Sequence, residues 1–245
     1  MLWLIFLCWG SFLNFIAYRL IFHKSFFTAK SYCPHCKQSI AWYDLIPVVS
    51  WIILKAHCRQ CKKTISWLYP FIELITAISC TLLFYQVSSA YFASYFFFFS
   101  ALIVTIRTDL ETMLISRFVS LYAVPIGFLC AYLHLLPISL YQSTLGAITG
   151  FLFLWLVAHL FYKITGKIGM GDGDPELLAF IGSFTGFFGW WTSLLLASLL
   201  GSLIGIPLAL YTKNRSLKLP FGPFLAFGAL TFVLFQRYIL AFFFC

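Results

Sequence analysis

The chain is poor in charged residues, and poorest in acidic ones. Only 9% of its 245 residues are charged and seven are Asp or Glu, whereas 62% are hydrophobic. A soluble domain of this length needs a polar surface toward water, so this composition excludes one. The mean hydropathy of +0.95 indicates an integral membrane protein instead.

Short runs of alternating polar and apolar residues, the mark of a transmembrane barrel, are missing. The apolar runs are continuous and rich in Leu and Phe, and a helix needs roughly 20 such residues to cross a bilayer. Helices also satisfy every backbone group in lipid. The sequence therefore predicts an all-α bundle of eight transmembrane helices, the third and sixth being shortest, near residues 2–22, 67–87, 91–106, 118–137, 144–162, 176–189, 192–211 and 219–241.

The first run lacks the basic start and the small-residue cleavage site of a signal peptide, so we expect it to remain as the first helix. Lys and Arg are absent from the loops near 88–90, 138–143 and 190–191. They occur in the alternate loops, as Lys24, Lys30, Lys37, Lys55, Arg59, Lys62, Lys63, Arg107, Arg117, Lys163, Lys167, Lys213, Arg215 and Lys218. The positive-inside rule then predicts that these loops are cytoplasmic and that both termini lie outside. This placement accounts for the net charge of +9 without a nucleic-acid partner.

The polar loop at residues 23–66 contains two Cys-x-x-Cys motifs, formed by Cys33, Cys36, Cys58 and Cys61. Two such motifs at this spacing are typical of a closed, structural four-cysteine zinc site. The alternative, a pair of disulfides, is disfavoured in a reducing cytoplasm. We expect His35 and His57 to be neighbours of the site and not ligands.

Between the two motifs lies the aromatic stretch "AWYDLIPVVSWIILK". It is short and interrupted, so we expect it at the membrane interface. The alternative is a re-entrant or short spanning hairpin.

Three of the seven acids fall in "KIGMGDGDPELL", residues 167–178, at the start of the sixth predicted helix. Another, Asp109, follows the third. Two carboxylates held within a few Å share one proton, which is the arrangement that an aspartic protease uses to activate water. Gly171 and Gly173 lack Cβ atoms, which permits a positive φ and the close approach of a substrate backbone. The alternative is a polar loop whose acids cap a helix N-terminus.

The chain resembles the bacterial type IV prepilin leader peptidases, which are Gly-x-Gly-Asp intramembrane aspartyl proteases. The resemblance covers most of the length and rests on "GSFLNFIAYRL", "CPHC", "WYDLIPVVSW", "CRQC", "ISWLYPFIEL", "DLETMLI" and "GMGDGDPELLAFIG". It implies an eight-helix bundle of the inner membrane whose active site faces the cytoplasm. It also implies cleavage of the basic leader from prepilins and pseudopilins, and in many members methylation of the new N-terminus with S-adenosylmethionine.

By this resemblance the catalytic aspartates are Asp109 and Asp174, and Asp172 lies in the active-site loop between Gly171 and Gly173. Asp172 remains an alternative, because Gly169-Met170-Gly171-Asp172 also fits Gly-x-Gly-Asp. Two departures stand out. The stretch before Cys33 is short, which weakens the methyltransferase assignment, and Ser116-Arg117 stands where relatives often have Pro-Asp.

The resemblance divides the chain into two parts. Residues 1–90 would form the zinc-loop and methyltransferase part, and residues 91–245 a six-helix peptidase core. We expect the polar residues Asn14, Arg19 and Glu73 to hold the methyl donor or the incoming N-terminus, or else to form a buried structural contact. Two other classes stay open: a proton-coupled transporter, and a non-enzymatic zinc-loop scaffold for pilus assembly or secretion.

Overall fold

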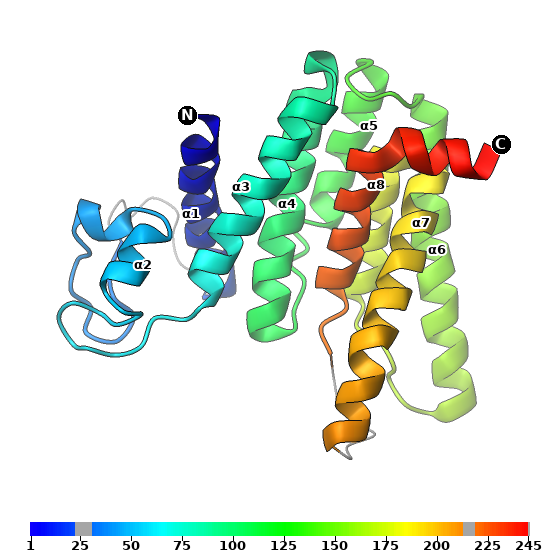
Figure 1. Cartoon of the computed structure of the whole chain (residues 1–245). Coiled ribbons are helices and arrows are strands. Elements are labelled where there is room, and N and C mark those ends of the chain that lie inside the picture. The colour runs from blue at the N-terminus through cyan, green and yellow to red at the C-terminus, as the bar shows by residue number, and fades with distance from the viewer. Residues whose placement is uncertain (23–30, 213–218, 245) are drawn as a thin grey trace. The chain divides into compact units, whose positions relative to one another are not determined.

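The computed structural model describes residues 1–22, 31–212 and 219–244 (Figure 1). The predicted cytoplasmic charges Lys24, Lys30, Lys213, Arg215 and Lys218 lie outside the described residues. Within them the regular secondary structure is helical, apart from two isolated antiparallel bridges. The helices are α1 (Leu2–Ile21), η1 (Trp42–Leu45), α2 (Val49–Ile53), α3 (Leu68–Gln86), α4 (Ser89–Thr112), η2 (Leu121–Ala123), α5 (Val124–Tyr132), α6 (Leu140–Thr165), α7 (Gly173–Thr212) and α8 (Gly222–Phe244).

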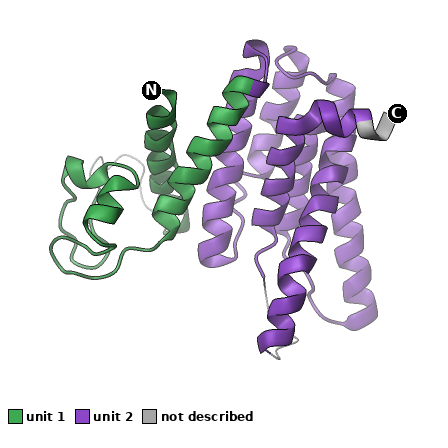
Figure 2. Cartoon of the chain, viewed as in Figure 1, with its two compact units in different colours: residues 1–85 green, residues 86–245 purple. Residues whose placement is uncertain are grey.

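The chain divides into two compact units (Figure 2). Unit 1 spans Met1–Tyr85 and contains α1, the cysteine loop and nearly all of α3. Unit 2 spans Gln86–Cys245 and contains α4 to α8. Each unit therefore has helices and a candidate site of its own.

Six helices of the described chain are long and apolar enough to cross a membrane, namely α1, α3, α4, α6, α7 and α8. In lipid no water is available to hydrogen-bond free backbone N–H and C=O groups, so apolar stretches of this length fold as helices. This finding supports the predicted all-α membrane protein.

Helix α7 consists of two antiparallel segments that meet at Gly186. Before Gly186, α7 runs antiparallel to α6: Gly182 packs on Gly146, and the carbonyl of Leu178 packs on Gly150. After Gly186 the direction is reversed, because Trp190 also reaches Gly150 and its Nε1–H donates to Thr149 Oγ1 at 3.0 Å. Gly186 has φ 70° and ψ −168°, a backbone conformation available essentially only to glycine.

The structure corrects three predicted boundaries. The chain reverses at Gly186, not at residues 190–191, which belong to the second α7 segment. Helix α4 has 24 residues and continues to Thr112, so the third apolar run is not among the shortest. The fourth predicted helix, residues 118–137, contains only η2 and the nine-residue α5.

The core of unit 2 joins α4 and α6 to the first α7 segment. Phe98 of α4 stacks on Phe184 of α7 with ring centroids 4.8 Å apart. The hydroxyl of Ser143 on α6 donates to the Ser183 carbonyl at 2.5 Å. Small residues such as Gly146 and Gly182 let α6 and α7 approach closely, as is usual for helix pairs in membranes. These contacts hold the first α7 segment, which carries Asp174 in its first turn.

A Gly186→Ala substitution places a Cβ in a conformation that alanine avoids. We expect it to lower the free energy of unfolding by about 1–3 kcal/mol, seen as a lower melting temperature of the purified protein in detergent. Gly201→Ala is the matched control, because a Cβ there meets only ordinary contacts with Phe224 and Phe221. Equal melting temperatures for the two variants would contradict the role of Gly186.

Candidate active site

Asp109 lies in the last turn of α4. The helix ends soon after it, because Met113 adopts the left-handed conformation with φ 55° and its N–H donates to the Asp109 carbonyl at 2.8 Å. The residue is 4% exposed. The end of α4 thus places an acidic side chain inside unit 2.

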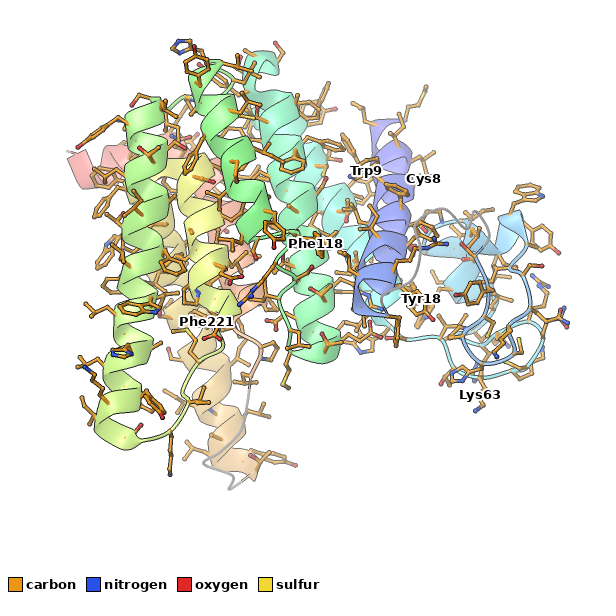
Figure 3. All side chains as sticks on the ribbon, turned by 180° about the vertical axis from the view of Figure 1, so that it is seen from behind. Cys8, Trp9, Tyr18, Lys63, Phe118 and Phe221 are labelled. Atoms are coloured by element: carbon orange, nitrogen blue, oxygen red, sulfur yellow. The ribbon has the colours of Figure 1, made fainter. Side chains whose placement is uncertain are left out.

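The Asp109 side chain contacts the start of α8. Its Oδ2 accepts a hydrogen bond from the Gly222 N–H at 2.9 Å. Backbone N–H groups at a helix N-terminus are unsatisfied and favour a carboxylate there. A Cβ on residue 222 would lie 2.7 Å from this oxygen, so any other residue there would displace the carboxylate. Figure 3 labels the preceding residue, Phe221.

Sequence reasoning missed Gly222. A signal was present, since Gly222-Pro223 precedes the last apolar run and proline is common in the first turn of a helix. Nothing in that signal, however, indicates a contact with a residue 113 positions earlier.

Asp174 lies in the first turn of α7 and is 8% exposed. Its N–H donates to the Gly171 carbonyl at 3.3 Å, which turns the loop into the helix. The charge of Asp109 acts unfavourably on Asp174, and Ile115 packs both on Gly173, next to Asp174, and on Gly222, whose N–H holds Asp109. Asp172, by contrast, is exposed. The structure therefore brings Asp109 together with Asp174, hereafter the acidic pair.

Ile115 lies beside the acidic pair, between the first residues of α7 and α8. A Cβ on Gly173 would lie 2.8 Å from the Ile115 Cβ, and a Cβ on Gly222 would lie 3.4 Å from its Cδ1. The segment after α4 thus packs on the N-termini of both α7 and α8.

This packing also shows how the structure uses one of the two loop glycines. Among the described residues the glycines with positive φ are Gly166 and Gly186, so Gly171 and Gly173 do not use the positive φ that the missing Cβ permits. Gly173 instead leaves room for Ile115.

Two further acids of unit 2, Glu111 and Glu176, have arginine partners. Glu111 pairs with Arg107 within α4, and Glu176 Oε1 lies 3.0 Å from Arg117 Nε. Within the described residues neither member of the acidic pair forms an ion pair. Two buried carboxylates without a cation are unfavourable unless one proton neutralises part of their charge. Such a pair can act at once as general base and general acid.

In unit 1 the four cysteines form one group. Their sulfur atoms lie within 4.8 Å of one another, and each Cys-x-x-Cys motif folds as the same tight turn. In the first turn, the Cys33 N–H donates to the Gln38 carbonyl and the Lys37 N–H donates to the Cys33 carbonyl. In the second turn, the Cys58 N–H donates to the Lys63 carbonyl and the Lys62 N–H donates to the Cys58 carbonyl. A four-sulfur group of this size fits a tetrahedral zinc ion. The group includes neither His35 nor His57.

The second turn has backbone hydrogen bonds to the Cys58 thiol and an ion pair to η1. The N–H groups of Cys61 and Gln60 donate to Cys58, which lowers the pKa of its thiol to about 7 and favours the thiolate that a metal binds. Arg59 forms a two-point ion pair with Asp44 of η1, with N···O distances of 2.9 and 2.7 Å. The hydrogen bond from Arg59 also lowers the pKa of Asp44.

The three polar residues predicted for methyl transfer are buried in unit 1 and contact its own atoms. Asn14 donates to the Tyr69 carbonyl at 3.1 Å. Glu73 accepts the N–H of Val48, which has φ 60°, at 2.8 Å. The Arg19 guanidinium lies 4.0 Å from the centre of the Phe15 ring. In this structure Glu73 therefore stabilises the start of α2.

Replacing Cys33 and Cys58 with Ser removes one thiolate from each turn. We expect the purified wild-type protein to contain about one zinc ion per chain and the double variant to lose it, as measured by elemental mass spectrometry. The control is Cys130→Ser, which lies outside the group and should retain the metal. Unchanged zinc in the double variant, or none in the wild type, would disprove the site.

Two family models match the chain. The "Bacterial Peptidase A24 N-terminal domain" matches residues 4–87, and the "Type IV leader peptidase family" matches residues 96–210. No solved structure matches the chain.

Proteins named prepilin leader peptidase/N-methyltransferase are similar over most of the chain. The protein from Aeromonas hydrophila is 31% identical over 243 residues, covering 89% of this chain and 83% of the relative. The one from Legionella pneumophila is 30% identical over 256 residues, covering 90% and 85%. The one from Dichelobacter nodosus is 32% identical over 254 residues, covering 91% and 87%. The chain therefore belongs to the type IV leader peptidase family.

Proposed function

We propose that this chain is an aspartic endopeptidase of the bacterial inner membrane that removes the basic leader from type IV prepilins and pseudopilins. One observation carries the proposal: the acidic pair lies buried where the end of α4 meets the first turn of α7. The relatives' names and the matched family support the same activity.

The acidic pair would perform hydrolysis with one shared proton. The ionised carboxylate takes a proton from a water molecule, which then attacks the scissile carbonyl. The protonated carboxyl donates a hydrogen bond to that carbonyl and later gives its proton to the leaving amine. The Gly222 N–H holds Oδ2 of Asp109, so this carboxyl keeps a fixed orientation during the reaction.

The acidic pair is recessed relative to the ends of neighbouring helices. Gly150 of α6 lies beside Leu178, four residues after Asp174, and α6 continues to Thr165. At a rise of about 1.5 Å per residue, α6 extends about 16 Å beyond the level of Asp174. Leu156, Leu160 and Ile164 on this extension are exposed and apolar. This geometry favours a scissile bond cleaved at the depth of the lipid, near one face.

For topology we propose eight membrane crossings. Five of the six long helices cross once, α7 crosses twice because it reverses at Gly186, and α5 supplies the eighth crossing. The basic loops would face the cytoplasm and both termini the periplasm, in accord with the positive-inside rule. The acidic pair then opens toward the cytoplasm. A prepilin would dock laterally, its leader in the cytoplasm and its apolar helix in the bilayer.

We further propose that residues 1–90 carry a methyltransferase function and residues 91–245 the peptidase. The relatives' names include N-methyltransferase, and S-adenosylmethionine would supply the methyl group. Asn14 and Arg19 are buried polar residues of α1 suited to hold the donor or the new N-terminus. Glu73 is already engaged by the Val48 N–H, so its primary role would be to shape the cysteine loop.

Asp109→Asn and Asp174→Asn each remove a carboxyl that the reaction needs. We expect either change to lower leader cleavage by at least about 10³-fold, measured as the shift of a prepilin band on a gel with purified protein. Asp172→Asn is the matched control, since Asp172 is exposed, and it should retain activity.

Retained processing in either Asn variant of the acidic pair would reject it. Loss with Asp172→Asn alone would reassign the second aspartate. A transporter or a non-enzymatic scaffold would leave the prepilin intact in every case.

Labelled S-adenosylmethionine in the same reaction tests methylation. We expect label in the mature pilin, and only when cleavage has produced the new N-terminus. Glu73→Gln should retain methylation if Glu73 is structural. Abolished labelling by a normally folded Glu73→Gln protein would instead assign it to donor binding.

A further inference from the structure

An ion pair joins the two chain segments that carry the acidic pair. Arg117 lies eight residues after Asp109, in the segment that follows α4, and Glu176 lies two residues after Asp174, in the first turn of α7. The Arg117 Nε and Glu176 Oε1 are 3.0 Å apart. The other ion pair of the described part of unit 2, Arg107–Glu111, lies within α4 alone. Arg117 thus connects the first turn of α7 with the segment after α4 by charge.

The two partners differ strongly in exposure. The Arg117 side chain is 64% exposed, whereas that of Glu176 is 8% exposed. Glu176 Oε2 is buried and has no hydrogen-bond partner among the described residues. A buried carboxylate needs a neutralising partner. The α7 N-terminus supplies part of that stabilisation, and Arg117 supplies the cation.

The backbone around Arg117 is held in place. The Ser116 carbonyl accepts the N–H groups of Val119 and Ser120 at 3.0 and 3.2 Å, and the Arg117 carbonyl accepts the Tyr122 N–H at 3.0 Å. Arg117 therefore projects from an ordered turn that leads into η2. Figure 3 labels the neighbouring residue of this turn, Phe118.

We propose that Arg117 is a positioning residue for the acidic pair: its ion pair with Glu176 holds the first turn of α7 against the segment after α4, and thereby keeps Asp174 beside Asp109. Ile115 supplies the apolar contact between the same segments, and Arg117 supplies the directional one. The proposal rests on the proposed peptidase function.

Arg117→Gln removes the cation at an exposed position and should leave the fold intact. We expect kcat for prepilin cleavage to fall about 10- to 100-fold, because small displacements of reacting groups have effects of this size. KM should stay within about twofold of wild type, since Arg117 does not bind the substrate in this account. The assay uses the full-length protein, with rates expressed per folded molecule.

Conservative and control variants separate positioning from a general structural effect. Arg117→Lys preserves the charge and should retain most of the kcat. Lys167→Gln, in the loop before α7, removes an exposed positive charge that has no ion-pair partner among the described residues, and should behave like wild type. If Arg117→Gln does not accumulate, Glu176→Gln breaks the same pair from the other side and should show the same loss.

The double variant Arg117→Gln/Glu176→Gln completes the test. If the two residues act as one link, the double variant is no worse than Arg117→Gln alone. Three results would each overturn the positioning role: a normal kcat in Arg117→Gln, a full recovery of kcat in the double variant, or a loss of kcat in the double variant equal to the product of the two single losses. A wild-type protein that does not cleave prepilin would instead refute the proposed function itself.

Discussion

The proposed hydrolysis requires two carboxylates close together inside an apolar helix bundle, and several contacts of unit 2 bear on this requirement. Acids so close to hydrocarbon are costly. Asp109 lies in the last turn of α4 and Asp174 in the first turn of α7, so both side chains lie where backbone polar groups are available. The Gly222 N–H satisfies one oxygen of Asp109, and the Phe98–Phe184 stack fixes α4 against α7. Because the chain reverses at Gly186, the first α7 segment is short. Its first turn, with Asp174, therefore lies about 16 Å from the level of the end of α6.

The two units are stabilised by different interactions. Unit 2 has many close backbone contacts at glycine, as expected where lipid removes the hydrophobic drive between helices. Unit 1 organises its polar loop with four sulfurs and an Arg59–Asp44 ion pair. That loop is too small to bury a core of its own, so a bound metal would supply its folding energy.

The sequence predicted the elements that depend on composition and spacing. Lipid permits few alternatives to a helix, so long apolar runs indicated helices correctly, and Cys-x-x-Cys spacing identified the sulfur group. The sequence did not reveal Gly186 as the reversal, because the apolar run continues past it without a break. Gly222 and the Arg117–Glu176 pair were missed because both contacts join distant segments. At Gly171 and Gly173 the sequence showed freedom to adopt positive φ, but the structure uses only the missing side chain at Gly173.

The most direct test of the central claim is the distance between the two aspartates in the membrane. Asp109→Cys/Asp174→Cys protein would be oxidised in native membranes, and its peptides analysed by mass spectrometry, which separates this crosslink from those of the natural cysteines. The account predicts a disulfide between positions 109 and 174, and far less in an Asp109→Cys/Asp172→Cys control. A crosslink favouring position 172, or none at 174, would contradict it.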